Sequence, residues 1–468
     1  FAEIKAYALS NTWDHAEVKG ANYSEAVQSI NEKILRLGSL ASSEPEYLVR
    51  LGENIWEKHI DALWTFGKGL ARGSQDKMET FEFLLELADK LAIEKIQPVL
   101  MQGFVNEVQI ESPGLARRMY ERFLQERKFK EHFVYLLCAI PLEAWGVLKL
   151  IELAAAGELD AWKFVQISHG RVHERISDDD LAKLLEAILE LDGGVPAVLQ
   201  ILDMRFHIDK GGDYIPSEFV LTVGRKAIKR MSIMHRDEFL PFRSYGYENI
   251  ANFCLSPAAP KREISEITAQ ICEGVETLRL YSFELGDLIS PLIRNFPEIV
   301  LDNVFIGGKR ESLRIHLLFR ESSSGLRETS LNEAPIDRLL AWCGRDQRKI
   351  LTVGKALRAY STVNASESQI DNLRKVSLSD HIKAFLDAAD DKAEMINVIV
   401  SSAWPSSWSG SRADILEARA QAFSELLNHS SDEVCSLAAS KLQLIENSVR
   451  ENRLRETDEE SEGEQRFE

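Results

Sequence analysis

The stretch SDDDLAKLLEAILELDGG, residues 177–194, decides the fold class. Ser177 has the side chain of a preferred helix N-cap, and the three aspartates after it place negative charge where a helix begins. The apolar residues then recur at i, i+3, i+4, i+7 and i+8, which is one face of an amphipathic helix. Gly193-Gly194 is expected to end this helix, because glycine accepts the left-handed conformation. The apolar face consists of Leu181, Leu184, Leu185, Ile188 and Leu189.

The same helical period recurs from Tyr23 to about Ser448, with no run that alternates as a strand does. Ser43 and Glu46, on either side of Pro45, have capping-box spacing and predict another helix start. We therefore predict an all-α protein. Two further apolar stripes are Phe81, Leu84, Leu85 and Ala88, and Val434, Leu437, Ala438 and Leu442.

Helix breaks are spaced so that two of them per hairpin give a period of roughly 35–45 residues. This period predicts an α-solenoid of stacked helical hairpins, HEAT- or TPR-like, with irregular repeats. The segments 64–70 and 102–105 are interpreted as equivalent helix ends in successive units. The breaks are expected near Ser42-Ser43, Gly73-Ser74, Ser112-Pro113, Pro141, Gly157, Ser177 and Gly193-Gly194.

The predicted organisation has five parts. A linker or incomplete first helix (1–22) precedes a helical-repeat array (23–320). A polar hinge loop (321–335) separates this array from a C-terminal helical array (336–456), and an acidic tail follows (457–468). Loops are also expected at 206–216, where a β-hairpin would be a local exception, and at 404–411. Because the chain starts at Phe1, we expect it to be cut from a longer polypeptide.

Charge and cysteine content restrict the class of protein. The net charge of −18 opposes phosphate binding, so we expect no nucleic-acid partner. A local basic patch on 225–230 is interpreted as a solvated helix face. The five cysteines form no CxxC pair, which favours buried free thiols in a reducing cytoplasm. No apolar run approaches the ~20 residues that span a bilayer, so no membrane association is expected. The basic patch consists of Arg225, Lys226, Lys229 and Arg230.

No motif predicts catalysis. Gly67-Lys68-Gly69 lacks the spacing and the strand of a phosphate-binding loop, and is interpreted as a helix break. Ser409 lacks the strand context of a nucleophile elbow. Trp404 and Trp408 could anchor a partner, but packing between helix ends is the preferred interpretation. We expect no enzyme activity, although a helical enzyme with a dispersed active site is a third alternative.

Two clusters have the residue types of metal ligands. His169 and His173 are four apart and precede Glu174, yet Gly170 interrupts any shared helix, so a polar loop or capping role is preferred. The carboxylates of Asp387, Asp390 and Asp391 suit a hard cation, but a solvated helix end is the simpler interpretation. We therefore expect no metal, cofactor or catalytic residue.

Several segments together resemble the helical C-terminal regions of bacterial antiviral STAND NTPases of the AVAST group. The resemblance implies a helical-repeat sensor that binds a phage protein and follows an effector and an NTPase. Neither of those two domains has motifs in this chain, and no family contact residue can be placed on a numbered position. The segments are PLEAWG (141–146), GRVHERI (170–176), Leu184-Leu185, QIL (200–202) and WPSSWSGS (404–411).

Two functions are therefore expected, and they share one fold. The first is a protein-binding sensor module of an antiphage defence protein, which recognises a phage structural or packaging protein and couples it to an attached effector. The alternative is a general helical-repeat scaffold or regulatory protein without enzymatic activity. The sequence leaves open a homo-oligomer formed through attached domains, and it does not show which face binds a partner.

Overall fold

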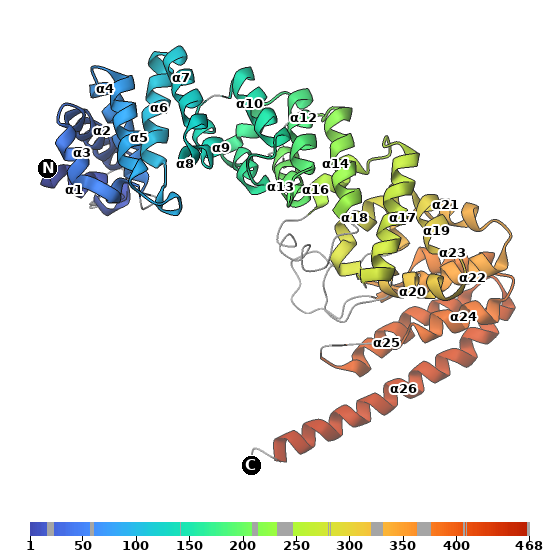
Figure 1. Cartoon of the computed structure of the whole chain (residues 1–468). Helices are drawn as coiled ribbons and strands as arrows, with labels where there is room; N and C mark the ends of the chain where they lie inside the picture. The colour runs from blue at the N-terminus through green and yellow to red at the C-terminus, as the bar shows by residue number, and fades with distance from the viewer. Residues whose placement is uncertain are drawn as a thin grey trace. The chain divides into compact units, whose positions relative to one another are not determined.

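The computed structural model describes residues 1–15, 23–56, 60–140, 142–207, 214–231, 247–278, 280, 282–319, 331–362, 376–405, 408 and 410–465. Almost all of them lie in helices, so the predicted all-α class is confirmed (Figure 1). The chain divides into two compact units, residues 1–223 and 224–468.

In the first unit, helices pack against their second neighbours along the chain, as stacked hairpins do: α2 against α4, α4 against α6, and α10 against α12. This gives the unit a solenoid-like character. Its elements are α1 (Ala2–Ala8), η1 (Thr12–His15), α2 (Tyr23–Ser42), α3 (Pro45–Leu51), η2 (Gly52–Ile55), α4 (Asp61–Gly73), α5 (Lys77–Asp89), η3 (Ile93–Lys95), α6 (Val99–Glu111), α7 (Pro113–Gln125), α8 (Arg127–Lys130), α9 (Phe133–Leu137), α10 (Ala144–Ala155), α11 (Ala161–Phe164), η4 (Val165–Arg175), α12 (Asp178–Leu189), α13 (Gly194–Phe206) and the start of α14 (Glu218–Met231).

The second unit is also helical, and its helices α17, α19 and α21 pack in the same alternating way. Its elements after α14 are α16 (Glu248–Cys254), α17 (Lys261–Leu278), α18 (Ser282–Asn295), α19 (Pro297–Val304), α20 (Gly308–Phe319), η6 (Leu331–Glu333), α21 (Ile336–Cys343), α22 (Gln347–Ala356), β1 (Tyr360–Thr362), β2 (Val376–Leu378), α23 (Asp380–Ala388), α24 (Lys392–Ser401), α25 (Arg412–Phe423), η7 (Ser424–Asn428) and α26 (Asp432–Gln465).

The helix predicted from residues 177–194 is α12. The Ser177 hydroxyl accepts the N–H of Asp180 at 3.3 Å and donates to the Asp180 carboxylate at 2.9 Å, so Ser177 is the predicted N-cap. All five residues of the apolar stripe are buried. The end of the helix differs, because α12 stops at Leu189 and Gly193 lies at the start of α13 with φ +68°. The left-handed glycine therefore begins the next helix.

Glycines interpreted as helix breaks lie inside packed helices, so this interpretation is wrong. Gly67 and Gly69 are in the middle of α4, and Gly103 is in the middle of α6. A Cβ at Gly103 would lie 2.0 Å from the Trp64 carbonyl oxygen, and one at Gly67 would lie 2.1 Å from the Leu100 oxygen. Glycine at these positions lets the backbones of α2, α4 and α6 touch, which no larger residue permits.

The capping box predicted at Ser43 does not form. The N–H groups of Ser43 and Glu44 donate to carbonyl oxygens of Leu40 and Ala41, both at 3.3 Å, so these two residues complete the end of α2. Helix α3 then begins at Pro45 without a side-chain cap. Proline compensates because its missing N–H would have no partner in the first helical turn.

A short β-hairpin is the exception to the helical fold in the described part of the chain. Strands β1 and β2 pair antiparallel, with Tyr360 opposite Leu378 and Thr362 opposite Val376. The sequence predicted no strand here, because three-residue strands are too short to show alternation. The segment 206–216, proposed as a local exception, lies partly outside the described residues.

The predicted chain ends, hinge and helix breaks compare with the structure as follows. Residues 1–15 include helix α1, and α26 continues through Gln465 into the predicted acidic tail. The hinge proposed at 321–335 lies mostly outside the described residues and stays a prediction. The expected break at Pro141 also falls outside them, whereas α4 ends at Gly73 and α7 begins at Pro113 as predicted.

The cysteines are free thiols, as predicted, and three of the five are buried. Burial raises the pKa of Cys272 and of Cys343 to about 11, so these thiols stay protonated at neutral pH. Cys138 and Cys435 are partly exposed. Among the described helices, none combines the length and the apolar character needed to cross a bilayer.

Candidate functional site

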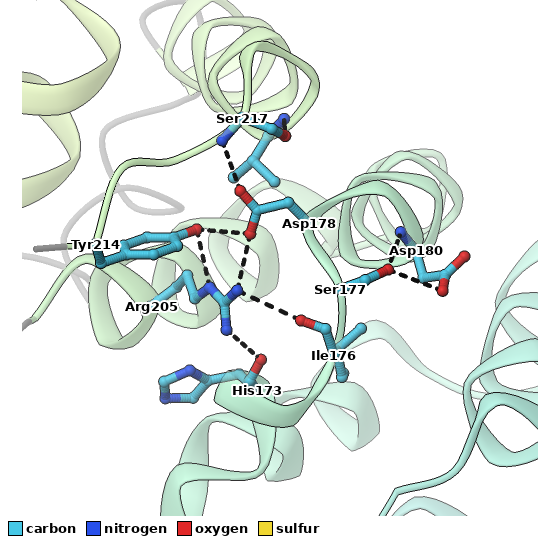
Figure 2. Close-up of polar contacts among 9 residues, drawn as sticks. His173, Ile176, Ser177, Asp178, Asp180, Arg205, Tyr214 and Ser217 are labelled. Carbon is cyan, nitrogen blue, oxygen red and sulfur yellow. Dashed lines mark hydrogen bonds and ion pairs between the residues drawn. The ribbon is translucent and has the colours of Figure 1, made fainter.

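A partly buried polar network in the first unit is centred on Arg205 of α13 and Asp178, the first residue of α12 (Figure 2). Arg205 Nη2 lies 2.8 Å from Asp178 Oδ1, and the two side chains are 8% and 16% exposed. Removing two charges from water is costly, so such a pair needs further hydrogen bonds to be stable. Both partners have them.

Arg205 donates in three further directions. Its Nε donates to the Tyr214 hydroxyl at 2.9 Å, its Nη1 to the His173 carbonyl at 2.6 Å, and its Nη2 also to the Ile176 carbonyl at 3.4 Å (Figure 2). The guanidinium carbon also lies 4.7 Å from the centre of the Tyr214 ring. One side chain therefore joins the end of η4, the start of α12 and the segment that precedes α14.

Asp178 accepts from the same segment. The Tyr214 hydroxyl donates to Oδ1 at 2.7 Å, and the Ser217 N–H donates to Oδ2 at 2.6 Å. Burial raises the pKa of Asp178, but these hydrogen bonds and the Arg205 charge outweigh burial and hold this pKa below its usual value. Burial also raises the pKa of Tyr214 to about 12, so its hydroxyl keeps the proton that it donates.

We call Asp178, Arg205, Tyr214 and Ser217 the Asp178 clamp. The clamp holds both ends of residues 214–217, immediately before α14. Pro216 within this segment is buried, but Ile215 is 86% exposed and Phe219 on the first turn of α14 is 65% exposed. The segment is therefore held at both ends, and it presents two large exposed apolar side chains, which we call the apolar pair (Ile215 and Phe219). Exposed apolar groups of this kind are common at protein interfaces.

The two histidines considered as metal ligands do not share a helix face. The backbone kinks between them, where Gly170 and Arg171 both have φ +60°. His169 is exposed, whereas His173 is 2% exposed and its Nδ1 is buried without a hydrogen-bond partner in the described structure. The loop interpretation is therefore correct for His169 and wrong for His173. Burial, assisted by the Arg205 charge, lowers the pKa of His173 to about 4.

The basic patch on α14 is solvated only in part, because Lys226 is exposed whereas Arg225 is buried. Arg225 is 2% exposed and forms an ion pair with Glu263 of α17, and Lys229 lies 2.6 Å from Glu266 one turn further along α17. The sequence interpretation was wrong for Arg225 because it considered α14 alone, whereas Arg225 and Lys229 pair with another helix nearly 40 residues later. These two pairs neutralise two of the four positive charges of the patch.

The three aspartates near residue 390 have separate structural roles. Asp391 caps α24 by accepting the N–H of Glu394 at 2.9 Å, while the Asp387 carboxylate lies 2.9 Å from His429 Nε2. Asp390 contributes its backbone N–H to Gln347 at 2.8 Å. Within the described ranges, no three His, Cys, Asp or Glu side chains gather in a geometry that could hold a metal ion.

The loop at 404–411, which carries Trp404 and Trp408, only partly matches the expected packing between helix ends. Trp408 is 49% exposed, with the Arg412 guanidinium 4.4 Å from its ring centre, so the expected packing between helix ends is only partial. Ser411 caps α25 by accepting the N–H of Asp414 at 3.0 Å. Ser409 lies outside the described residues. Trp404 is partly exposed and lines a cavity of the second unit.

Sequence reasoning missed the Asp178 clamp. Asp178 was interpreted as a charge at a helix start, which is correct, but its partners Arg205 and Ser217 lie 27 and 39 residues later. No spacing rule connects residues so far apart. No family model matches the chain, and a search of curated proteins found no relative.

Proposed function

We propose that this chain is a protein-binding helical-repeat module and that the apolar pair is part of its contact surface. The supporting observation is the Asp178 clamp, which fixes the backbone on both sides of Ile215 while that side chain is 86% exposed. A segment ordered before binding loses less conformational entropy on association, so its apolar contacts contribute more to affinity.

The charge of the molecule favours a protein with a basic surface beside its apolar pocket. Glu218 is exposed between the two members of the apolar pair, and the whole chain carries a net charge of −18. Complementary charge accelerates association and makes its rate sensitive to salt, whereas the apolar contacts determine how slowly the complex dissociates.

The proposed role of this binding follows from the sequence resemblance. It is recognition of a phage structural or packaging protein by a HEAT- or TPR-like sensor that is coupled to an attached effector. The alternative is a scaffold that binds cellular proteins through the same surface. The complete reading frame distinguishes them, since an NTPase and an effector upstream support the sensor and a free-standing frame supports the scaffold.

A defined binding panel tests the proposal. The purified chain is offered phage structural and packaging proteins, host proteins, and single- and double-stranded DNA and RNA. We expect a protein to bind, and the double variant Ile215→Ser/Phe219→Ser to bind it at least tenfold more weakly, which corresponds to about 1.4 kcal/mol. Ile110→Ser on α6 is the matched control, because Ile110 is 68% exposed and lies far from 215 in the sequence.

A third variant separates positioning from contact. Tyr214→Phe keeps the ring but removes the hydroxyl that joins Arg205 to Asp178, so we expect weaker binding without loss of an apolar contact.

Two outcomes would contradict the proposal. Normal affinity in the Ile215→Ser/Phe219→Ser variant would show that the partner uses another surface. Tight, salt-resistant binding to nucleic acid with no protein bound would contradict both the sensor and the scaffold.

A further inference from the structure

Helices of the second unit are joined to helices about 40 residues later by polar contacts near the surface. Arg338 of α21 is paired with Glu298 of α19, with Nε 2.7 Å from Oε1 and Nη2 in contact with Oε2. One turn further along both helices, Trp342 Nε1 donates to Asp302 Oδ1 at 2.7 Å. We call these two contacts the α19–α21 link.

The same arrangement recurs between α23 and η7. Lys383 Nζ lies 2.8 Å from Glu425, and Asp387, one turn later, lies 2.9 Å from His429 Nε2. Because His429 Nδ1 accepts the N–H of Ser431 at 3.1 Å, the Nε2 atom carries the proton and donates to Asp387. We call these two contacts the α23–η7 link. The contacts span 40 residues in the first link and 42 in the second.

The charged groups of both links are accessible to dissolved ions. The side chains of the two ion pairs are 36–44% exposed, and the second contact of each link has an aspartate carboxylate as its acceptor. Exposed ion pairs are weak singly, and salt weakens them further by screening their charges. Each link therefore depends on contacts whose strength falls as ionic strength rises.

Contacts of another kind join α2, α4 and α6 in the first unit. A Cβ at Gly38 would lie 2.3 Å from the Phe66 carbonyl oxygen, and one at Gly69 would lie 2.2 Å from the Leu35 oxygen. A glycine hydrogen takes the place of that Cβ and points at the oxygen, so these are Cα–H···O contacts between helix backbones. The glycines between α4 and α6 described above make the same contact. Such contacts carry no net charge for salt to screen.

The ion pair between α4 and α6 also differs from those of the links. Arg72 Nε lies 2.6 Å from Glu107 Oε1, and the Glu107 side chain is only 5% exposed. Salt screens a buried charge much less than an exposed one. The three helices, which we call the glycine block (α2, α4 and α6), are therefore expected to hold at ionic strengths that weaken the links.

We propose that the chain combines a rigid glycine block with a salt-responsive second unit, in which ions control the local opening of α19, α21, α23 and η7. In a helical-repeat array each repeat contacts only its neighbours, so one contact loosens without unfolding of the rest. Ionic strength then adjusts the helix contacts of the second unit and leaves the glycine block unchanged. The inference is independent of the proposed protein binding, because it concerns the chain without a partner.

Hydrogen–deuterium exchange, followed by mass spectrometry on the whole chain, tests the proposal. Exchange is compared in about 0.1 M and about 1 M sodium chloride, between which the Debye length falls from roughly 10 Å to roughly 3 Å. An unstructured peptide in the same solutions corrects for the effect of salt on exchange itself. We expect amides of α19, α21, α23 and η7 to exchange about two- to threefold faster at the higher salt, as weak exposed contacts allow, and amides of the glycine block to show no change.

A double variant assigns the response to one link. Glu298→Gln/Asp302→Asn removes both carboxylates of the α19–α21 link, so α19 and α21 should exchange faster already at the lower salt and lose their response to salt. The α23–η7 link is untouched in this variant and should respond as before. Glu446→Gln on α26 is the matched control, because Glu446 is exposed and forms no ion pair in the described part of the chain. Melting temperatures check that both variants are folded.

Gly103→Ala tests the glycine block separately. The added methyl group forces the backbones of α4 and α6 apart, so the exchange of both helices should rise together and by the same factor at either salt concentration. The proposal is overturned if neither link responds to salt, if the glycine block responds as strongly as the links, or if the double variant keeps the response of the unaltered chain.

Discussion

Arg205 Nη2 and Asp178 Oδ1 lie 2.8 Å apart, and this ion pair joins the last turn of α13 to the first residue of α12. Each charge is also hydrogen-bonded to groups outside the pair, including the Tyr214 hydroxyl. A buried pair adds little net stability compared with apolar residues, but the loss of one partner leaves the other charge buried and unpaired. The pair therefore specifies how the segment before α14 is held.

Asp178→Asn should destabilise the first unit. The substitution keeps the shape of the side chain and removes the charge that compensates Arg205, so we expect a loss on the order of 3 kcal/mol. Urea unfolding measures it. Asp179→Asn is the control, because Asp179 is exposed in the same helical turn and should lose only about 0.5 kcal/mol of helix-dipole interaction. Equal losses in the two variants would show that the clamp contributes nothing beyond helix capping.

His173 should make stability depend on pH. Burial lowers its pKa from 6.5 to about 4, and burial lowers that of His132 to about 4 as well. Between these values the unfolded chain binds protons that the folded chain does not bind, so stability should fall as the pH is lowered from about 6.5 towards 4. The expected loss is on the order of 2 kcal/mol for each histidine.

The variant His173→Phe tests the origin of this slope. It removes both the titrating group and the unpartnered Nδ1, so unfolding measured from pH 4 to pH 7 should show a shallower dependence, with no loss of stability at pH 7. His169→Phe is the matched control, because it makes the same substitution at an exposed position. An unaltered slope in His173→Phe would assign the pH dependence to other groups.

The helical class was predictable because the information for it is local. Ser177 and the leucines of α12 lie within one window, and their pattern alone predicts both the cap and the buried face. The glycines of α4 and α6 were misinterpreted for the opposite reason. Gly103 is required by the carbonyl of Trp64 on another helix, and its local signal is only poor helix propensity.

The candidate site depends almost entirely on contacts between distant residues. Asp178 and Tyr214 are 36 residues apart, and their hydrogen bond lies next to the exposed side chain of Ile215. Likewise, one cavity of the second unit is lined by both His316 of α20 and Trp404, which follows the end of α24. Periodicity predicts which face of a helix is buried, but it does not predict which helix covers that face.

Leu185→Asp should disrupt the core beneath α12. Leu185 is fully buried, so the substitution places an unpaired carboxylate among apolar side chains, and we expect a loss of several kcal/mol, on the order of 4. Thermal melting measures it. Leu148→Asp on α10 is the matched control, because Leu148 is 56% exposed and its replacement should change stability by less than about 0.5 kcal/mol. A normal melting temperature for Leu185→Asp would contradict the buried position of this face.

Gly103→Ala should destabilise the packing of α4 on α6, although alanine is the better helix former. The added methyl group would lie 2.0 Å from the Trp64 carbonyl oxygen, and a backbone atom cannot rotate away as a flexible side chain can. The two helices must separate, at a cost of about 3 kcal/mol, which exceeds the gain of roughly 1 kcal/mol in helix propensity.

Gly114→Ala on α7 is the control, since no atom lies within 4 Å of its added Cβ, and we expect it to be neutral or stabilising by about 0.5 kcal/mol. Chemical unfolding of both variants measures whether each substitution lowers or raises the free energy of unfolding. Equal stabilisation by both would show that α4 and α6 are not in backbone contact.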